Sequence, residues 1–434
     1  MEVTLISVVV LIAALMMGIP IPFAFFASTL TIVTLGGYDI TFLPPYGYAK
    51  AGSIILIAIP LFVMAGSFME KGGIGESLIN LIDCFVGRIK GGLGAVMVLS
   101  CAVFGSVCGS GMATLSCIGS IMLPRMYAAG YPRGISSALI SSACLLGLLI
   151  PPSLSMLLYA WAGGQSVLAC FLSTLIPGLI LIVLLSAVNF WLLRNDKNII
   201  IPERIPMKEN IKRIRTCSVR AIPALIAPFI ILGGIYGGLM TPTEAAAAAV
   251  VYSAPVGYWI YKGLKKPGAL LNCMIESITT AGVIMMMLFS VMILCRLYIM
   301  ENVPRMIMQL LLSVSSNPTV LIMLVNVFMV IIGMFMDDTS AILLSTPILL
   351  PVVTQLGIHP VHFAAILGVN LGMGCVTPPT TPFLFLGSRV GKAPVTEMLG
   401  PTFCFIAFAW IPLLILTTYI PGLALFLPRT FGFA

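Results

Sequence analysis

Long, continuous runs of apolar residues follow one another along this chain, separated by short polar or Gly- and Pro-rich connections. Because the apolar residues are continuous rather than alternating, the runs predict membrane-crossing helices and exclude a membrane barrel of strands. Most of the runs approach or exceed the roughly 20 residues that a helix needs to cross a bilayer. They extend approximately over Val3–Met17, Pro20–Leu35, Gly52–Met69, Leu93–Leu123, Ser136–Ala162, Val167–Leu193, Ala221–Met240, Thr243–Tyr261, Leu270–Ile299, Thr319–Leu350, Val361–Leu386 and Met398–Ile420.

Four of these runs contain residues that break a helix. Two are interrupted by small and polar residues, at Gly105–Gly111 and Gly333–Ser340, and two by proline pairs, Pro151-Pro152 and Pro378-Pro379. A break exposed to lipid leaves peptide groups without partners, at a cost of several kcal/mol each. The breaks must therefore be buried in protein or line a wet cavity, which predicts a binding site.

The pattern occurs twice. Residues of the same type stand 227 positions apart at Pro124 and Pro351, Gly130 and Gly357, Gly147 and Gly374, Gly164 and Gly391, and at the two proline pairs. The chain is therefore predicted to contain two copies of one unit. We expect residues 1–193 to form the first repeat, with a hairpin at about 93–123 and a broken helix at about 134–162. Residues 194–220 form a basic cytoplasmic connector, and 221–434 the second repeat, with a hairpin at about 319–350 and a broken helix at about 361–390.

Composition supports the membrane class, because only 8% of the 434 residues are charged whereas a soluble domain has about 25%. The net charge of +8 comes from Lys and Arg in the connections, where the positive-inside rule places them, so nucleic-acid binding is not required. Arg125 and Arg133 follow the first hairpin, whereas Pro351–Val361 after the second has no Lys or Arg. The two copies are thus predicted to be inverted, with both hairpins re-entrant and both chain ends periplasmic.

Other classes of chemistry find little support. The 11 cysteines contain no C-x-x-C pair and are expected to be buried apolar residues. No basic segment precedes the first run, so it is expected to be retained. There is no phosphate-binding Lys motif, no nucleophile–base pair and no metal-ligand cluster at a recognisable spacing, so an enzyme is not expected and uphill transport would need an ion gradient. Interrupted helices in inverted repeats favour a secondary transporter over a channel.

Each pair of breaks offers two kinds of polar group. Helix C-terminal carbonyls and hydroxyls suit a small hard cation, and free amides at helix N-termini suit a carboxylate. Neutral oxygens favour Na⁺ over Ca²⁺ or Mg²⁺, which prefer several carboxylates. The alternative interpretation is that these Gly and Pro residues only shape tightly packed helices.

Asp337 and Asp338 are the only acids that we place deep in the membrane, where a charge is a functional candidate. We expect one of them to act on a cation or a proton and the other to cap the following half-helix with Thr339. Glu244, after Thr241-Pro-Thr243, is interpreted as a first-turn helix acid with a structural role.

Several motifs together resemble the large membrane subunit of the tripartite ATP-independent periplasmic (TRAP) transporters. They are Gly105-Ser-Val-Cys-Gly-Ser-Gly-Met-Ala-Thr114, Gly119-Ser-Ile-Met-Leu-Pro124, Ile150-Pro-Pro-Ser153, Thr241-Pro-Thr-Glu-Ala245, Gly333-Met-Phe-Met-Asp337, Pro347-Ile-Leu-Leu-Pro351 and Thr377-Pro-Pro379. The resemblance covers essentially the whole chain. It implies an all-α polytopic protein of the bacterial inner membrane, an elevator-type ion transporter with two hairpins and two broken helices.

The resemblance also implies partners and ligands. The partners are a small four-helix membrane subunit, not fused before Val3, and a periplasmic binding protein that delivers an organic acid such as a C4-dicarboxylate or a sugar acid. No cofactor is expected beyond Na⁺ as the coupling ion. One Na⁺ is expected near Gly105, Ser106, Gly147 and Ser153, and another near Gly333, Asp337, Gly374, Thr377 and Thr380. For the substrate we expect Ser110, Pro151, Pro152, Asp338, Thr339, Pro378 and Pro379.

Two points stay open at this level. Cys108 stands where the family often has a small hydroxylated residue, so whether this position supplies a hydroxyl ligand stays open. The alternative function is a self-sufficient Na⁺-coupled anion carrier or Na⁺/H⁺ antiporter of related hairpin architecture.

The charge pattern makes a topological prediction. A cysteine introduced between Arg194 and Arg220 should stay unlabelled when an impermeant thiol reagent is added outside intact cells, because basic connections remain in the cytoplasm. A cysteine in the 351–361 loop serves as the labelled control. Labelling of the basic connector from outside would contradict the topology.

Overall fold

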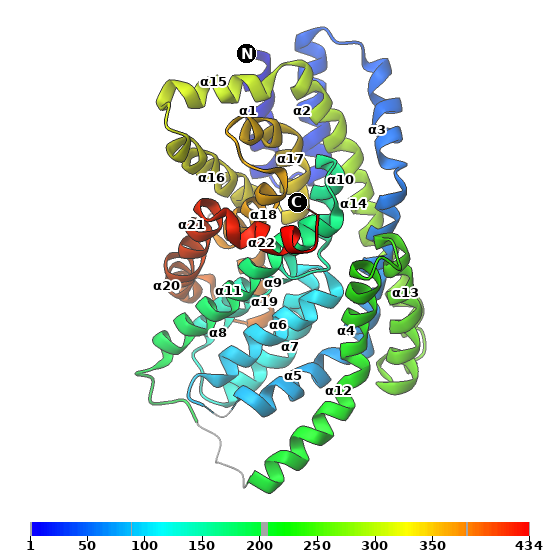
Figure 1. The fold of residues 1–434 in the computed structure, drawn as a ribbon, viewed down its shortest axis with the longest axis vertical. Helices are drawn as coiled ribbons and strands as arrows, with labels where there is room; N and C mark the ends of the chain where they lie inside the picture. Colours follow the sequence, from blue (N-terminus) through cyan, green and yellow to red (C-terminus); the bar gives the residue numbers. More distant parts are fainter. Residues whose placement is uncertain (1, 88, 201–206, 379–380, 434) are drawn as a thin grey trace.

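The computed structural model describes residues 2–87, 89–200, 207–378 and 381–433, and all regular secondary structure in these ranges is helical (Figure 1). Six of the described helices are long and apolar enough to cross a membrane, and a bent pair of helices could add a seventh. The polytopic all-α class predicted from the apolar runs is therefore confirmed.

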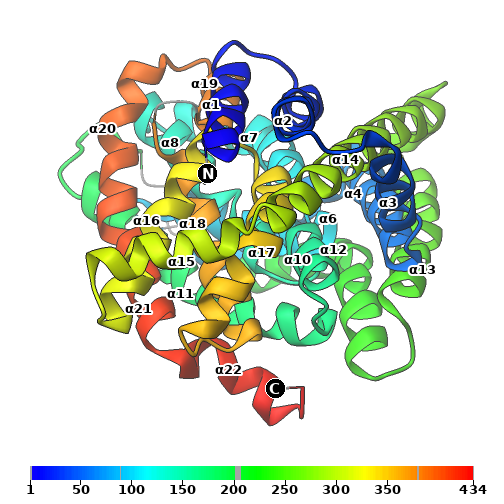
Figure 2. The ribbon, with the colours of Figure 1, turned by 90° about the horizontal axis from the view of Figure 1, so that it is seen from above.

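One group of helices forms a wall along one side of the molecule (Figures 1 and 2). It contains the N-terminal pair α1 and α2 and the long helix α14, which packs against α2, α3 and α4. Ser7, Ser28 and Tyr298 link α1, α2 and α14 through buried hydroxyl groups at 2.7–3.2 Å. The members are α1 (Glu2–Met16), α2 (Ile21–Gly36), α3 (Leu43–Ala51), α4 (Ala58–Gly72), α12 (Met207–Tyr236), α13 (Pro242–Pro255) and α14 (Ala269–Met300), with short turns η1 (Ile40–Phe42), η2 (Ile54–Ile57), η3 (Val256–Ile260) and η4 (Gly263–Lys265).

Two short amphipathic helices were not predicted. They are α5 (Ile74–Val86) and α15 (Val303–Val314), which follow α4 and α14 and lie toward opposite ends of the molecule (Figure 1). Each is only 12 or 13 residues long and carries polar residues along one face, so a search for long apolar runs misses it.

The two segments where hairpins were predicted are each divided into two helices, and the breaks are shorter than expected. In the first, α6 (Gly92–Cys108) is followed by α7 (Gly111–Ala128), and in the second, α16 (Pro318–Phe335) by α17 (Asp338–Gln355). Gly105 and Gly333, which we expected in the interruptions, therefore lie inside helices. The chain turns only at Gly109-Ser110 and at Met336-Asp337.

The two segments where broken helices were predicted are also interrupted, and glycines lie where they contact α6 and α16. The first comprises α8 (Arg133–Ala143), α9 (Leu146–Leu149) and α10 (Leu154–Gly163), bent by 45°, and the second α18 (Pro360–Val376) and α19 (Pro382–Gly391). A Cβ on Gly105 would lie 2.7 Å from the Cα of Gly147, and one on Gly374 would lie 2.7 Å from the Cα of Gly333. The interior glycines thus allow two backbones to touch, as the packing interpretation expects.

The remaining helices are α11 (Val167–Leu193), α20 (Val395–Phe405), η5 (Ile406–Trp410), α21 (Ile411–Tyr419) and α22 (Pro421–Thr430). The polar connector expected at 194–220 is partly helical, because α12 already begins at Met207. A salt bridge of 2.6 Å between Arg213 and Asp83 of α5 joins this basic start of α12 to the rest of the chain.

Three hydrogen bonds connect helix ends that carry or adjoin basic residues. Lys90, before α6, donates to the carbonyl of Arg194 at 2.8 Å, and Ile200 N–H donates to Ala129 O, after α7, at 3.0 Å. Tyr127, at the end of α7, donates to the carbonyl of Gly391 at 2.8 Å. The start of α6 and the ends of α7, α11 and α19 therefore lie together.

The glycine crossing predicts a stability effect. Gly105→Ala should lower the unfolding temperature of the purified protein, because the added Cβ meets backbone that cannot rotate away; overpacking of this kind costs about 1–3 kcal/mol. Gly282→Ala is the matched control, since nothing lies within 4 Å of its Cβ position on α14. An unchanged unfolding temperature for Gly105→Ala would show that the two backbones are not held in contact.

Candidate substrate and ion site

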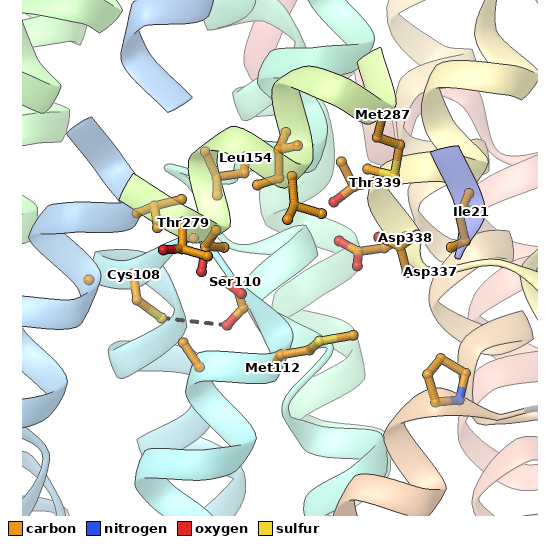
Figure 3. Close-up of a pocket in the computed structure, with 18 of the residues that line it drawn as sticks. Ile21, Cys108, Ser110, Met112, Leu154, Thr279, Met287, Asp337, Asp338 and Thr339 are labelled. Atoms are coloured by element: carbon orange, nitrogen blue, oxygen red, sulfur yellow. Dashed lines mark hydrogen bonds between the residues drawn. The ribbon is translucent and has the colours of Figure 1, made fainter. Parts of the chain in front are cut away.

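A cavity of about 790 Å³ lies between the two hairpin tips and the helix wall (Figure 3). One side is formed by the turn Phe335–Thr339, and another by Cys108–Ala113 of the first hairpin. Helices α4 and α14 and the start of α2 close the remaining sides. The cavity therefore brings together two segments more than 200 positions apart.

The second hairpin places two carboxylates at the cavity. Asp337 is the N-cap residue of α17 and accepts a short hydrogen bond from Ser340, and Asp338 is the first helical residue. Asp338 also accepts a hydrogen bond of 2.8 Å from Ser155 of α10. Both side chains, with Thr339, lie at the cavity in Figure 3. The two acids thus differ in their hydrogen-bond donors: one donor is local and the other belongs to the opposite half of the chain.

The first hairpin places a helix N-terminus at the cavity without an acid. Ser110 is the N-cap residue of α7, and within the described chain its hydroxyl makes no capping hydrogen bond. The first amides of a helix have no partner within the helix, so those of α7 are available to a ligand. Cys108 contacts the Ser110 carbonyl (3.5 Å) and the Thr114 hydroxyl (3.2 Å), and it occupies the position where a hydroxyl ligand was in doubt.

Two further acids line the cavity that the sequence analysis missed. Glu70 stands near the end of α4, and Glu276 lies in α14, where it forms a salt bridge with Lys71. Glu276 falls inside the apolar run Leu270–Ile299, which was a usable signal of an intramembrane acid. Glu70 follows directly after the predicted run Gly52–Met69, so the run does not include it.

The residues expected around the first Na⁺ lie together but outside the cavity lining. Gly105 and Gly147 are in backbone contact, and the Ser106 hydroxyl donates to the Val103 carbonyl at 2.7 Å. Ser153 is the N-cap of α10 and accepts a hydrogen bond of 3.2 Å from Met156 N–H.

The proline pair of the first broken helix lies behind the first hairpin tip. A cis peptide bond joins Pro151 and Pro152, and both are buried. A Cβ on Gly109 would lie 3.0 Å from the Pro152 carbonyl oxygen, and Leu154 N–H donates to the Gly109 carbonyl at 3.3 Å. Of this segment only Leu154 reaches the cavity, so direct substrate contact by the two prolines is not supported by this arrangement.

The residues expected around the second Na⁺ are arranged similarly. Gly333 and Gly374 are in contact, and Thr377, at the end of α18, donates through its hydroxyl to the Met373 carbonyl at 2.6 Å. Pro378 follows and is only partly buried. Pro379 and Thr380 lie outside the described residues. In the part of the chain that is described, no three His, Cys, Asp or Glu side chains form a group that could hold a metal ion.

The structural interpretation of Glu244 is confirmed. Thr241 N–H donates to its carboxylate at 2.7 Å, and Glu244 N–H donates to the Thr241 hydroxyl at 3.3 Å, which together form a capping box at the start of α13. These hydrogen bonds lower the pKa of Glu244, because they stabilise its ionised form. The residue is exposed and is not among the residues that line the cavity.

Comparison with known proteins identifies the family. The model of the tripartite ATP-independent periplasmic transporter DctM component matches residues 8–423. The C4-dicarboxylate TRAP transporter large permease protein DctM of Pseudomonas aeruginosa is 36% identical over 384 residues, which cover 87% of each chain. The sialic acid TRAP transporter large permease protein SiaM of Vibrio cholerae is 30% identical over 422 residues, covering 95% of this chain and 96% of that one.

A further relative is longer than this chain. The isethionate TRAP transporter permease protein DctMQ of Oleidesulfovibrio alaskensis is 34% identical over 415 residues, which cover 95% of this chain and 64% of that protein. Among solved structures, the YdaH transporter of Alcanivorax borkumensis has a TM-score of 0.60 at 16% identity, covering 89% of each chain. The likeness to the YdaH transporter concerns the fold alone.

These relatives are transporter permeases and not enzymes, as the sequence analysis expected. Their permease identity and the apolar helices together indicate a multi-pass protein of the inner membrane. The chain belongs to the DctM family, the large permease component of the TRAP transporters.

Proposed function

We propose that this chain is the membrane permease of a binding-protein-dependent secondary transporter that imports an organic acid with a Na⁺ gradient. The observation that carries the proposal is the cavity between the two hairpin tips. It combines an open helix N-terminus at Ser110 with partly buried carboxylates at Asp337 and Asp338. A permease that moves an anion together with a cation needs both kinds of group at one place.

We further propose that the two halves are inverted repeats and that both hairpins are re-entrant. Helices that start at Ile74, Gly92, Gly111, Arg133 and Val167 have counterparts that start at Val303, Pro318, Asp338, Pro360 and Val395, in the same order. The basic ends of α6 and α7 lie together through Lys90, Arg194 and Ala129, which supports a hairpin that enters and leaves on one side. Under the positive-inside rule this side is cytoplasmic, and both chain ends are then periplasmic.

An elevator mechanism fits the contacts between the halves. Ser155 of the first broken helix bonds to Asp338 of the second hairpin, and Phe383 of the second broken helix packs against Gly111 of the first hairpin. Hairpins and broken helices are thus interlocked across the repeat boundary and would move as one body. In this proposal the body slides past the scaffold, which it touches, for example, where Gly66 of α4 lies against Cys108.

We propose that the cavity opens toward the basic side. The cavity extends to Glu276, which forms a salt bridge with Lys71. The Lys71 backbone lies against Gly263, and the loop that contains Gly263 also carries Lys262, Lys265 and Lys266. With that loop in the cytoplasm, the arrangement corresponds to an inward-facing state.

For Na⁺ we propose the two glycine crossings and the adjoining helix ends. Gly105, Gly147 and Ser153 contribute backbone and hydroxyl oxygens in the first half, and Gly333, Gly374 and Thr377 in the second. Small residues let carbonyls approach an ion closely, and neutral oxygens suit Na⁺. Asp337, at the tip beside the second crossing, is proposed as the one acidic ligand.

The partners follow from the family. Its name describes a tripartite transporter, and by this likeness we propose a small membrane subunit and a periplasmic binding protein as the other two components. The relatives are named for a C4-dicarboxylate, a sialic acid and isethionate, all organic acids.

Reconstitution of the permease tests this function. Liposomes that contain the permease and its small subunit should take up the organic acid only when a Na⁺ gradient and the binding protein are both supplied. Uptake with Na⁺ but without any binding protein would favour the alternative, a self-sufficient Na⁺-coupled carrier. Uptake that ignores the Na⁺ gradient would contradict the coupling ion.

The second Na⁺ site makes a separate prediction. Thr377→Val keeps the shape of the side chain but removes its hydroxyl, so uptake should fall mainly at low Na⁺, with a higher Na⁺ concentration at half-maximal rate. Thr354→Val is the matched control, because Thr354 also donates to its own helix (Leu350 carbonyl, 2.7 Å) but lies away from the crossing. An unchanged Na⁺ dependence in Thr377→Val would refute the role of this residue.

A further inference from the structure

A second cavity, of about 320 Å³, lies between α3 and α14 on one side and α10 and α17 on the other. We call it the outer pocket. The part of α14 that lines it is the end that leads to α15 at the top of Figure 1, whereas the basic start of α12 lies at the bottom. Under the proposed topology the outer pocket is therefore on the periplasmic side.

Two cations meet at the outer pocket around one aromatic ring. Lys50 lines the pocket, and its Nζ lies 5.7 Å from the centroid of the Tyr46 ring. The guanidinium of Arg296 lies over the same ring at 5.4 Å, and Tyr46 itself lines the pocket. No Asp or Glu is among the described residues that do so. The pocket is thus positively charged.

Neither cation is neutralised by another part of the described chain. No described Asp or Glu forms an ion pair with Lys50 or Arg296. The contact with Tyr46 positions both charges but leaves them uncompensated, because the ring has no net charge. Both side chains are exposed, so their N–H groups can reach a ligand. A planar guanidinium fork beside an ammonium suits an oxyanion such as a carboxylate.

The outer pocket and the first cavity lie along the same helix. Met287 of α14 lines the first cavity and Met292 the outer pocket, about 7.5 Å apart along the helix axis. Helix α17 closes against α14 here, because the Ser340 hydroxyl donates to the Met287 sulfur at 2.7 Å and the Cys295 thiol to the Leu343 carbonyl at 3.8 Å. In the proposed elevator movement α17 slides along α14, so this closure would open on the outer side.

From these observations we infer that the outer pocket binds the oxyanion of the transported organic acid before it reaches the first cavity, with Lys50 and Arg296 as the donors. The inference rests on the proposed function and adds a second substrate site to it. The acids for which the relatives are named all carry a carboxylate or a sulfonate. The phosphate of a lipid headgroup shares this chemistry, so the test separates the two sources.

A tryptophan at the site allows a direct measurement. Trp161 lines the outer pocket. Of the other three tryptophans, Trp410 is fully buried, and the exposed Trp191 and Trp259 are replaced by Phe. The full-length chain with these two replacements is placed in phosphatidylcholine nanodiscs. Fluorescence quenching is then measured with iodide, which is an anion, and with acrylamide, which is neutral.

Charge variants test the two donors. Lys50→Gln and Arg296→Gln should each lower the iodide quenching constant about twofold and leave the acrylamide constant unchanged, because each removes a positive charge that concentrates iodide near Trp161. Using both guards against one variant failing to fold. Lys50→Arg should retain the quenching, since it keeps the charge. Lys266→Gln is the matched control, because it removes an exposed lysine outside the pocket.

Competition then identifies the ligand. Succinate, N-acetylneuraminate and isethionate are added at an ionic strength held constant with potassium chloride. At least one of them should lower the iodide constant about twofold, and this effect should be lost in Lys50→Gln and Arg296→Gln. Succinamide, the neutral amide of succinate, should have no effect. A second set of nanodiscs contains phosphatidylglycerol, which offers a lipid phosphate instead.

The outcomes separate the inference from the proposed function. Iodide quenching that is unchanged in both Gln variants would overturn the site. Protection by none of the three acids would overturn the inference, and protection by phosphatidylglycerol alone would assign the pocket to a lipid headgroup. Neither result bears on Na⁺-driven uptake, because quenching needs no Na⁺ gradient and no binding protein. Failed uptake in liposomes, with protection by an acid intact, would overturn the proposed function and leave an oxyanion site.

Discussion

The structure depends on one constraint, which is that a helix interrupted inside a membrane must find partners for its freed peptide groups. Here each hairpin turn is hydrogen-bonded to the interrupted helix that follows it in the chain. The Gly109 carbonyl at the first hairpin tip accepts a hydrogen bond from Leu154, just after the first proline pair, and the Met336 carbonyl at the second tip accepts one from Cys375 of α18 at 3.8 Å. Each hairpin turn therefore lies against an interrupted helix. The hairpin turns that bound the cavity are therefore the same segments whose freed peptide groups find hydrogen-bond partners in this way.

Close backbone contact makes this arrangement stiff. At Gly105 with Gly147, and at Gly333 with Gly374, the helices approach until no side chain fits between them. Contacts of this kind are strong in a membrane, where apolar side chains gain little by leaving lipid. The bond between Ser155 and Asp338 then joins the two halves. A unit assembled in this way is expected to keep its internal geometry while its contacts with α4 and α14 change, and the proposed sliding requires this.

Much of this organisation could be predicted from the sequence, because apolar runs and repeated Gly and Pro residues are one-dimensional signals. The helix class, the places where four of the runs are interrupted and the family followed from them. Helices α5 and α15 could not, since short amphipathic segments resemble polar connections. The location of Gly105 and Gly333 inside helices was also missed. The sequence alone does not distinguish a glycine that ends a helix from a glycine that lets two helices touch. Glu70 was missed because its place at the cavity is set by the packing of α4 against α13, α14 and the first hairpin tip, which no local pattern encodes.

The two tips differ although their surroundings match: Asp337 and Asp338 stand at the start of α17, and Ser110 and Gly111 at the start of α7. If the halves descend from one shorter gene product, that ancestor would have had to pair with an upside-down copy of itself, and both tips would have been identical. Such a homodimer could only offer a ligand two equal ends. Joining the copies into one chain freed each tip to change separately. In this view gene fusion did more than fix the ratio of the two halves at one to one. It also allowed the two hairpin tips to present different groups to a ligand.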